Sequence, residues 1–293
     1  SRPCSSSARH PVIARVGKWW LVVGGLAAGL AEDAARATPE DDRKAFVADY
    51  QARFPEVPIA ENANGIYALD ADARAQWQAI EDFPPYEFSI ERGAEGWRKP
   101  LPDGTTLAAC LGDDTASIRP RYPRYDATFG GVVTLPVAVN RCREAAGAEP
   151  LEYADAAMID LTAYLAYEAR GRKVDTQVPT DEPGALEAYE AGKQFYYSKR
   201  GQLNFACADC HVTSVSLYVR ADRLGPSLGH PTHFPVYRSK LGRVISLHER
   251  FYGCVRDVRA KPFALQSEEY RNVEYFLSYM SNGLEFNGPG ARK

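Results

Sequence analysis

The sequence predicts a mainly α-helical protein made of two domains. Apolar residues recur at helical spacing in several separate stretches, and glycines and prolines punctuate the segments between them. A polar stretch with two prolines, residues 173–184, divides these helices into two groups and is the best candidate for a linker. The 293 residues suffice for two compact units, and 45% hydrophobic with 25% charged residues is ordinary for a globular protein.

Residues 1–37 are predicted to form a signal peptide. Three basic residues precede an apolar run over residues 19–31, and small residues follow it. This order is typical of a secretory signal, although a buried or interfacial helix would give a similar pattern. The apolar run is short and rich in glycine, so we expect no membrane span in the mature protein. Cys4 would be removed with this segment.

The first unit, residues 38–175, is predicted to begin with two helices. Thr38, followed by a proline and two acidic residues, is typical of a helix N-cap. Apolar residues then recur at helical spacing as far as Phe54. A second helix is expected over residues 75–82, where Trp77 and its aliphatic neighbours are spaced for one helical face.

The rest of the first unit is predicted to be irregular and then helical. Prolines and glycines interrupt residues 83–123 so often that we expect loops and short elements rather than long helices. A helix near residues 150–169 has a broad apolar face and ends at Gly171.

The second unit, residues 176–293, is predicted to begin and end with a helix. Residues 185–197 and 267–280 both show apolar residues at helical spacing. A long irregular segment, rich in glycine and proline, lies between the two helices.

A haem-attachment motif follows the first helix of the second unit. Cys207, Cys210 and His211 form the CxxCH pattern, in which two thiols join haem vinyl groups and the histidine binds the iron. Half of a zinc site is one alternative, but no second CxxC pair is present to complete it. A chance match in a buried loop is another. The order of helix, motif, loops and final helix is that of a class I cytochrome c domain, so we expect one covalently bound haem c.

The second iron ligand is not an obvious methionine. Electron-transfer cytochromes of this class usually take a methionine from the loop before the final helix. The two methionines present, Met158 and Met280, are poorly placed for this role. The segment before the last helix offers one cysteine and three histidines: Cys254, His230, His233 and His248.

Cys254 is the preferred candidate because its sequence neighbours are basic. These neighbours are Arg250, Arg256, Arg259 and His248. If these cations gather around the sulfur, they lower the thiol pKa and favour the thiolate, which binds iron and attacks sulfur. An inert buried cysteine stays open as an alternative, as do His230 and His233 as iron ligands. If the segment is helical, Arg250 and Cys254 lie one turn apart on one face.

The overall charge argues against a nucleic-acid partner. The formal net charge is -3 and the sequence pI is about 6.0, so there is no basic surplus to neutralise phosphates. We therefore expect no nucleic acid among the partners.

The chain resembles the SoxA family, the cytochrome subunits of the thiosulfate-oxidising L-cysteine S-thiosulfotransferases. The resemblance covers most of residues 38–293 and is most specific in the second unit. It is carried by Gly201–Cys207, Gly229–Pro235, His248–Cys254, Pro262-Phe263, Ser267–Tyr270 and Ser281–Leu284. The resemblance implies two cytochrome c-like domains, a periplasmic location, and a SoxX-like cytochrome as the second subunit of a heterodimer. It also implies a SoxYZ-like carrier protein and thiosulfate as substrate.

The resemblance also assigns roles to residues. Cys254 corresponds to the family's haem-ligating active-site cysteine, which is often a persulfide, and Arg250 to its substrate-binding arginine. Many members carry a second CxxCH in the first domain, but here only Cys110 of that motif is kept. We therefore expect a first domain without haem, in which Cys110 and Cys142 are free to form a disulfide. Two unpaired buried thiols are the alternative.

Three functions are compatible with these residues. The first is an enzyme that joins thiosulfate to Cys254 and passes the product to a carrier thiol, with electrons leaving to a partner cytochrome. The second is an electron-transfer cytochrome without a catalytic role, in which the ligand only tunes the potential. The third is a thiosulfate dehydrogenase, which would form tetrathionate without a carrier protein.

Overall fold

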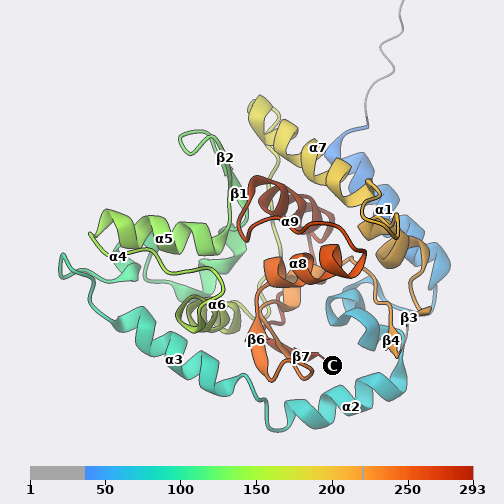
Figure 1. Cartoon of the computed structure of the whole chain (residues 1–293), viewed down its shortest axis with the longest axis horizontal. Coiled ribbons are helices and arrows are strands. Elements are labelled where there is room, and N and C mark those ends of the chain that lie inside the picture. Colours follow the sequence, from blue (N-terminus) through green and yellow to red (C-terminus); the bar gives the residue numbers. More distant parts are fainter. Residues whose placement is uncertain (1–36, 220, 293) are drawn as a thin grey trace, which may run out of the picture. The chain divides into compact units, whose positions relative to one another are not determined.

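The computed structural model describes residues 37–219 and 221–292, and its helices confirm the mainly α-helical prediction. Figure 1 shows α3 to α6 grouped together, with α7 and α9 beside α1 and α8 beside α9. The α-helices are α1 (Pro39–Arg53), α2 (Ala71–Glu81), α3 (Glu87–Arg98), α4 (Leu107–Leu111), α5 (Leu135–Ala145), α6 (Ala156–Glu168), α7 (Pro183–Tyr197), α8 (Leu247–Asp257) and α9 (Glu268–Met280). The shorter helical segments are η1 (Ile59–Ala68), η2 (Thr115–Ser117), η3 (Arg119–Arg121), η4 (Asp209–Thr213) and η5 (His230–His233).

The strands are short and form three small sheets. They are β1 (Arg124–Asp126), β2 (Gly131–Val133), β3 (Tyr218–Val219), β4 (Asp222–Arg223), β5 (Val236–Arg238), β6 (Arg243–Ile245) and β7 (Gly290–Arg292). Hairpins β1-β2 and β3-β4 are antiparallel pairs, whereas β5 lies between antiparallel β6 and parallel β7. None of the strands exceeds three residues, which is too short for a clear alternation of apolar and polar residues.

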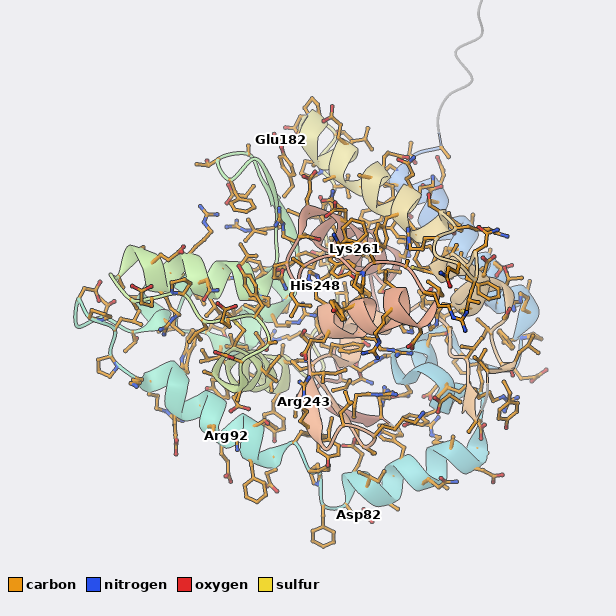
Figure 2. The ribbon with its side chains drawn as sticks, viewed as in Figure 1. Asp82, Arg92, Glu182, Arg243, His248 and Lys261 are labelled. Carbon is orange, nitrogen blue, oxygen red and sulfur yellow. A yellow bond between two sulfur atoms is a disulfide. The ribbon has the colours of Figure 1, made fainter. Side chains whose placement is uncertain are left out.

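The helix α3 corrects the prediction of loops over residues 83–123. It crosses α6 so closely that a Cβ on Gly93 would lie 2.0 Å from the carbonyl oxygen of Asp160. Glycine is therefore required here for helix packing and does not end the helix. Arg92, labelled in Figure 2, strengthens the same contact through a bidentate ion pair with Asp160, with nitrogen–oxygen distances of 2.7 and 3.0 Å.

The helices α7 and α9, the first and last helices of the second half, cross in the same way. A Cβ on Gly192 would lie 2.0 Å from the carbonyl oxygen of Asn272 and 3.0 Å from Cβ of Phe276. The aromatic rings of Tyr189 and Phe276 pack beside this crossing, with centroids 5.5 Å apart. Both halves of the chain therefore contain a helix pair joined at a glycine.

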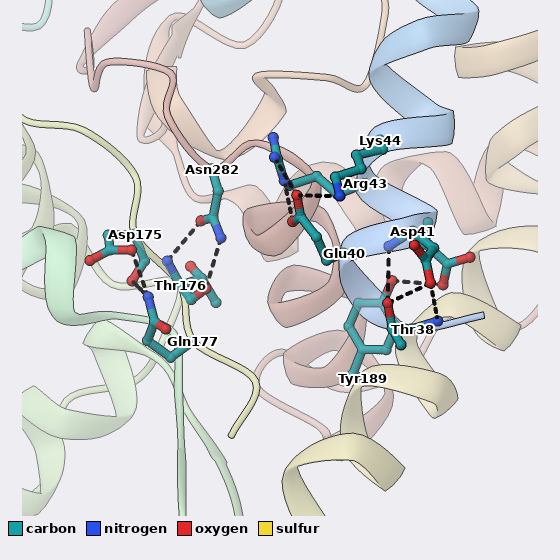
Figure 3. Close-up of polar contacts among 11 residues, drawn as sticks. Thr38, Glu40, Asp41, Arg43, Lys44, Asp175, Thr176, Gln177, Tyr189 and Asn282 are labelled. Carbon is teal, nitrogen blue, oxygen red and sulfur yellow. Dashed lines mark hydrogen bonds and ion pairs between the residues drawn. The ribbon is translucent and has the colours of Figure 1, made fainter. Parts of the chain in front are cut away.

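The first helix, α1, packs on the core of the second half. Phe46 and Tyr50 belong to the same apolar cluster as Tyr189 of α7. Thr38 caps α1 as predicted, with a reciprocal capping box to Asp41 that Figure 3 shows. Asp42 then accepts a hydrogen bond from the Tyr189 hydroxyl at 2.9 Å. The helix thus contributes to the half that contains the CxxCH motif.

Each half also contains a β-hairpin followed by a capped helix. Thr134 follows β1-β2 and caps α5, and Ser246 follows β5-β6 and caps α8 through a capping box. The two caps stand at the same spacing before Cys142 and Cys254, respectively. The halves therefore share an order of elements as well as a helix crossing.

The disulfide expected in the first half is present. Cys110 of α4 and Cys142 of α5 are bonded, with their Cα atoms 5.8 Å apart. Cys142 is buried in the first apolar core beside Leu107 and Ile118. A covalent bond therefore links two helices of the half that lacks a complete CxxCH motif.

The segment between α6 and α7 is held to the chain that follows α9. Thr176 donates its backbone N–H to Asn282 Oδ1, and Asn282 Nδ2 donates to the Thr176 carbonyl, each at 2.8 Å (Figure 3). Val174 is buried and donates its backbone N–H to the carbonyl of Leu284 at 2.8 Å.

No helix among the described residues is long and apolar enough to cross a membrane. The predicted signal peptide lies outside the described residues, apart from residue 37.

Candidate functional site

The CxxCH motif occupies the turn that follows α7. Cys207 precedes η4, which contains Cys210 and His211. The Asp209 carboxylate accepts the backbone N–H of Ala206 at 2.8 Å and closes this turn. The five residues of the motif therefore form a compact turn that carries two free thiols and one imidazole.

The His211 ring is oriented by the glycine-proline loop that follows it. Nδ1 lies 2.9 Å from the carbonyl oxygen of Gly225, so Nδ1 carries the proton and Nε2 is left as the metal-binding nitrogen. The backbone carbonyl of His211 accepts hydrogen bonds from the Tyr50 hydroxyl and, at 3.3 Å, from the Ser227 N–H. Burial lowers the pKa of His211 to about 4, so the ring is neutral at pH 7.

Cys254 and Arg250 lie one turn apart on α8, as the helical spacing required. The charge on Cys254 is the largest influence on Arg250 and raises the pKa of the guanidinium. Burial is the main cause that raises the pKa of Cys207 to about 11, Arg200 acts in the opposite direction, and a charge on Cys254 contributes to the rise. Burial and Cys254 likewise raise the pKa of Cys210. The structure thus brings the three thiols and Arg250 into one electrostatically coupled group.

The rival histidines lie against the motif's own histidine. The ring centroids of His230 and His211 are 4.6 Å apart. His233 is buried, and its Nδ1 lies 3.2 Å from the carbonyl oxygen of Ala63. The structure thus places His230 beside His211 and ties His233 to η1.

His248 does not join the basic group expected around Cys254. It is buried between α8 and α9, with Nδ1 accepting the Gln266 N–H at 3.1 Å and Nε2 2.8 Å from the Glu274 carboxylate. Figure 2 labels it on α8. Arg256 is exposed and pairs with Asp257 at 3.8 Å. Arg250 therefore shares the site with Cys254, whereas His248 faces α9, Arg256 pairs with Asp257 and Arg259 lies beyond the end of α8.

Sequence reasoning missed Arg238, a second arginine near the thiol group. It lies on β5, and after burial the charge of Arg250 is the main influence that lowers its pKa, whereas Cys254 acts in the opposite direction. Arg200 was also missed, and its guanidinium lies 3.7 Å from the Cys207 sulfur. Neither residue stands in a recognisable motif, and strand pairing rather than sequence spacing brings Arg238 to the site.

The donor set fits a haem of the c type better than a bare metal ion. Two thiols at CxxC spacing, a neutral histidine with a free Nε2 and a third thiol supply the groups that haem attachment and iron ligation require. Among the described residues, no three His, Cys, Asp or Glu side chains are placed to hold a metal ion directly. Met158 is buried in the first apolar core, and Met280 is buried in the second at the last turn of α9.

The comparisons with known proteins agree with this fold. The family model "SoxA/TsdA, cytochrome c domain" matches residues 92–174, within the half that contains the disulfide. The L-cysteine S-thiosulfotransferase subunit SoxA of Allochromatium vinosum is 52% identical over 257 residues, which cover 88% of this chain and 91% of the relative. The subunit of the same name from Chlorobaculum tepidum is 45% identical over 258 residues, covering 88% and 89%.

A solved structure is similar as well. The crystal structure of SoxXA from P. pantotrophus matches with a TM-score of 0.68 and 29% sequence identity, over 75% of this chain and 84% of that chain. The cytochrome c-like fold is thus shared along most of the described chain, beyond the CxxCH segment. Because the fold is shared and the relatives match over almost their whole length, the chain belongs to the family of the L-cysteine S-thiosulfotransferase subunit SoxA.

Proposed function

We propose that this chain is the SoxA-type subunit of an L-cysteine S-thiosulfotransferase, which joins thiosulfate oxidatively to a carrier-protein cysteine. The names of its relatives support this activity. The observation that carries the proposal is the coupling of Arg250 and Cys254, one turn apart on α8 and beside the CxxCH thiols. A cytochrome that only transfers electrons has no need of a cysteine paired with an arginine at this position.

Arg250 binds the substrate in this proposal. Thiosulfate is a dianion, and a fixed, half-buried guanidinium stabilises such an anion more strongly than an exposed one does. The guanidinium also presents a planar set of donors to the sulfonate oxygens. Binding at Arg250 places the outer sulfur of thiosulfate near the Cys254 sulfur, because the two side chains share one face of α8.

Cys254 forms the covalent bond. Its thiolate and the outer sulfur of thiosulfate join to give a cysteine S-thiosulfonate, and two electrons leave the sulfur pair. The thiolate of the carrier protein then attacks the sulfur that carries the sulfonate and releases Cys254 as a thiolate. The exchange consumes no further electrons, so Cys254 is ready for the next cycle.

The cofactor is proposed to be a single haem c. Cys207 and Cys210 form its thioether bonds, and His211 and Cys254 bind the iron. When bound, the haem accepts one electron at a time. The second electron therefore requires another redox centre, which we assign to a SoxX-like cytochrome in a heterodimer. The solved SoxXA complex of a relative supports this partner. A SoxYZ-like protein is the proposed carrier.

The domain division and location belong to the same proposal. Residues 38–175 form the haem-free cytochrome c-like domain and residues 176–293 the haem-binding one, with α1 packed on the core of the second. We assign the protein to the periplasm, with residues 1–37 as the signal peptide. The Cys110–Cys142 disulfide supports an oxidising compartment.

The variant Cys254→Met tests the proposed reaction. Methionine can still bind haem iron, so the haem is retained while the reacting thiol is removed. Thiosulfate-dependent reduction is measured with the partner cytochrome and a thiol acceptor, after absorbance has verified equal haem content. We expect turnover to be lost. Undiminished turnover would refute the role of Cys254, and wild-type turnover that needs no thiol acceptor would favour a thiosulfate dehydrogenase.

A further inference from the structure

Three arginines stand side by side across the sheet β6-β5-β7. Arg238 of β5 is opposite Arg243 of β6 in the antiparallel register and opposite Arg292 of β7 in the parallel register. Residues directly opposite on neighbouring strands project from the same face of a sheet. The three arginine side chains therefore project from the same face of the sheet, in one row across its strands.

Their charges are compensated very differently. Arg243 is exposed and lies 2.7 Å from the carboxylate of Glu249. Arg292 is only 8% exposed, and its guanidinium lies over the rings of Tyr67 and Trp77, 4.7 and 5.7 Å from their centroids. Its Nη1 donates to a backbone carbonyl at 2.9 Å, whereas its Nη2 is buried and has no hydrogen-bond partner among the described residues.

Arg238 is half-buried, and its side chain makes no hydrogen bond or ion pair within residues 37–219 and 221–292. Both arginines act electrostatically on residues of the candidate site. Arg238 acts electrostatically with Arg250 and Cys254, and Arg292 is among the charges that act on His230. Asp222 acts on Arg238, and Tyr67 and Glu81 act on Arg292, but no carboxylate forms an ion pair with either arginine among the described residues. A guanidinium that is withdrawn from water without such a pair is destabilising, so a bound anion is favoured on this face of the sheet.

We propose that Arg238 and Arg292 bind the carboxylates of the haem, which leaves Arg250 to bind thiosulfate. A carboxylate suits this site because two parallel N–H···O bonds match the planar guanidinium. The proposal rests on the proposed function only in that a haem is attached at Cys207 and Cys210. It divides the arginines near Cys254 into a pair on the sheet for the cofactor and one on α8 for the substrate.

The test compares holoprotein variants Arg238→Gln and Arg292→Gln with Arg243→Gln, a control from the same row whose charge is met by Glu249. Resonance Raman spectra report the bending modes of the haem carboxylates. We expect these modes to shift in the first two variants and stay unchanged in the control. The midpoint potential should fall in the first two by up to about 59 mV, a tenfold change in the one-electron equilibrium constant. The potential falls because the oxidised haem carries one more positive charge than the reduced haem, and removing a nearby cation stabilises it.

A second source of the anion is thiosulfate itself. Unchanged carboxylate modes, together with a KM for thiosulfate raised tenfold in Arg238→Gln and Arg292→Gln, would overturn the proposal in favour of substrate binding. If the glutamine variants accumulate without haem, Arg238→Lys and Arg292→Lys retain the charge, so we expect near-wild-type potentials with shifted carboxylate modes. Lysine variants with wild-type modes would contradict direct binding. Failure of thiosulfate turnover in the wild type would refute the proposed function but leave both spectroscopic measurements readable.

Discussion

Arg250 and Cys254 are positioned by the local structure of one short helix. Ser246 caps α8, and its capping box with Glu249 fixes where the helix begins. From that start, the helical repeat places Arg250 and Cys254 on one face, and His248 on a different face toward α9. The cap and the helical period therefore place the two proposed site residues on a different face of α8 from His248.

The first prediction concerns Arg250. Replacing it by glutamine removes a charged partner of thiosulfate, so we expect KM to rise about tenfold to a hundredfold, the value of a charged hydrogen bond. The matched control is Arg256→Gln, since Arg256 is on the same helix but 69% exposed. Steady-state reduction of the partner cytochrome measures both variants. Equal values of KM in Arg250→Gln and the wild type would remove Arg250 from the substrate site.

The site could be predicted from sequence where covalent chemistry fixes the spacing. Two thiols and a histidine in a CxxCH pattern need no tertiary information, and a helix is enough to relate Arg250 to Cys254. Arg238 could not be found this way, because pairing between strands of three residues brings it to the site. His248 was misplaced for a similar reason, since its direction depends on Glu274 of α9.

At the scale of elements, two crossings of helices at glycine organise the protein. The pairs α3–α6 and α7–α9 make the most extensive helix contacts, and each has a glycine against a backbone carbonyl. Helices with continuous apolar spacing, such as α6, α7 and α9, could be predicted from sequence. The helix α3 could not, because Gly93 and Gly96 resemble helix breakers until the partner helix is known.

The second prediction tests this requirement within α3. A Cβ at Gly93 would meet the Asp160 backbone at 2.0 Å, whereas a Cβ at Gly96 would meet only a flexible Leu161 methyl group at 3.3 Å. We expect Gly93→Ala to lower the free energy of unfolding by about 3 kcal/mol through overpacking. Gly96→Ala should change it by less than about 1 kcal/mol, since better helix propensity offsets a mild contact. Urea unfolding of both variants provides the comparison, and equal stabilities would contradict the close crossing.

At the scale of the whole molecule, the two halves share an architecture but differ at one place. Each has a crossed helix pair, a hairpin and a capped helix that carries a cysteine. In the second half this cysteine, Cys254, acts electrostatically on the CxxCH thiols. In the first half its counterpart Cys142 is bonded to Cys110. Buried Arg119 joins the halves by donating to the carbonyls of Tyr122 and Pro231.

The third prediction concerns the disulfide. It closes a loop with a sequence separation of 32 residues, for which chain entropy gives a stabilisation of about 3–4 kcal/mol. The double variant Cys110→Ser/Cys142→Ser should therefore unfold at lower urea concentration, while its haem content per chain stays at one. Denaturation followed by far-UV circular dichroism, with haem quantified in parallel, measures both quantities. An unchanged midpoint would show that the bond does not stabilise this half, and two haems per wild-type chain would contradict its assignment as haem-free.

The central claim is that Cys254 itself accepts the thiosulfate sulfur. The most direct measurement is the mass of the proteolytic peptide that carries Cys254, after the holoprotein and its partner cytochrome have reacted with thiosulfate without a thiol acceptor. We predict a thiosulfonate adduct on this peptide that disappears when the acceptor thiol is added. Reduction of the partner cytochrome by thiosulfate with Cys254 unmodified throughout would contradict the account.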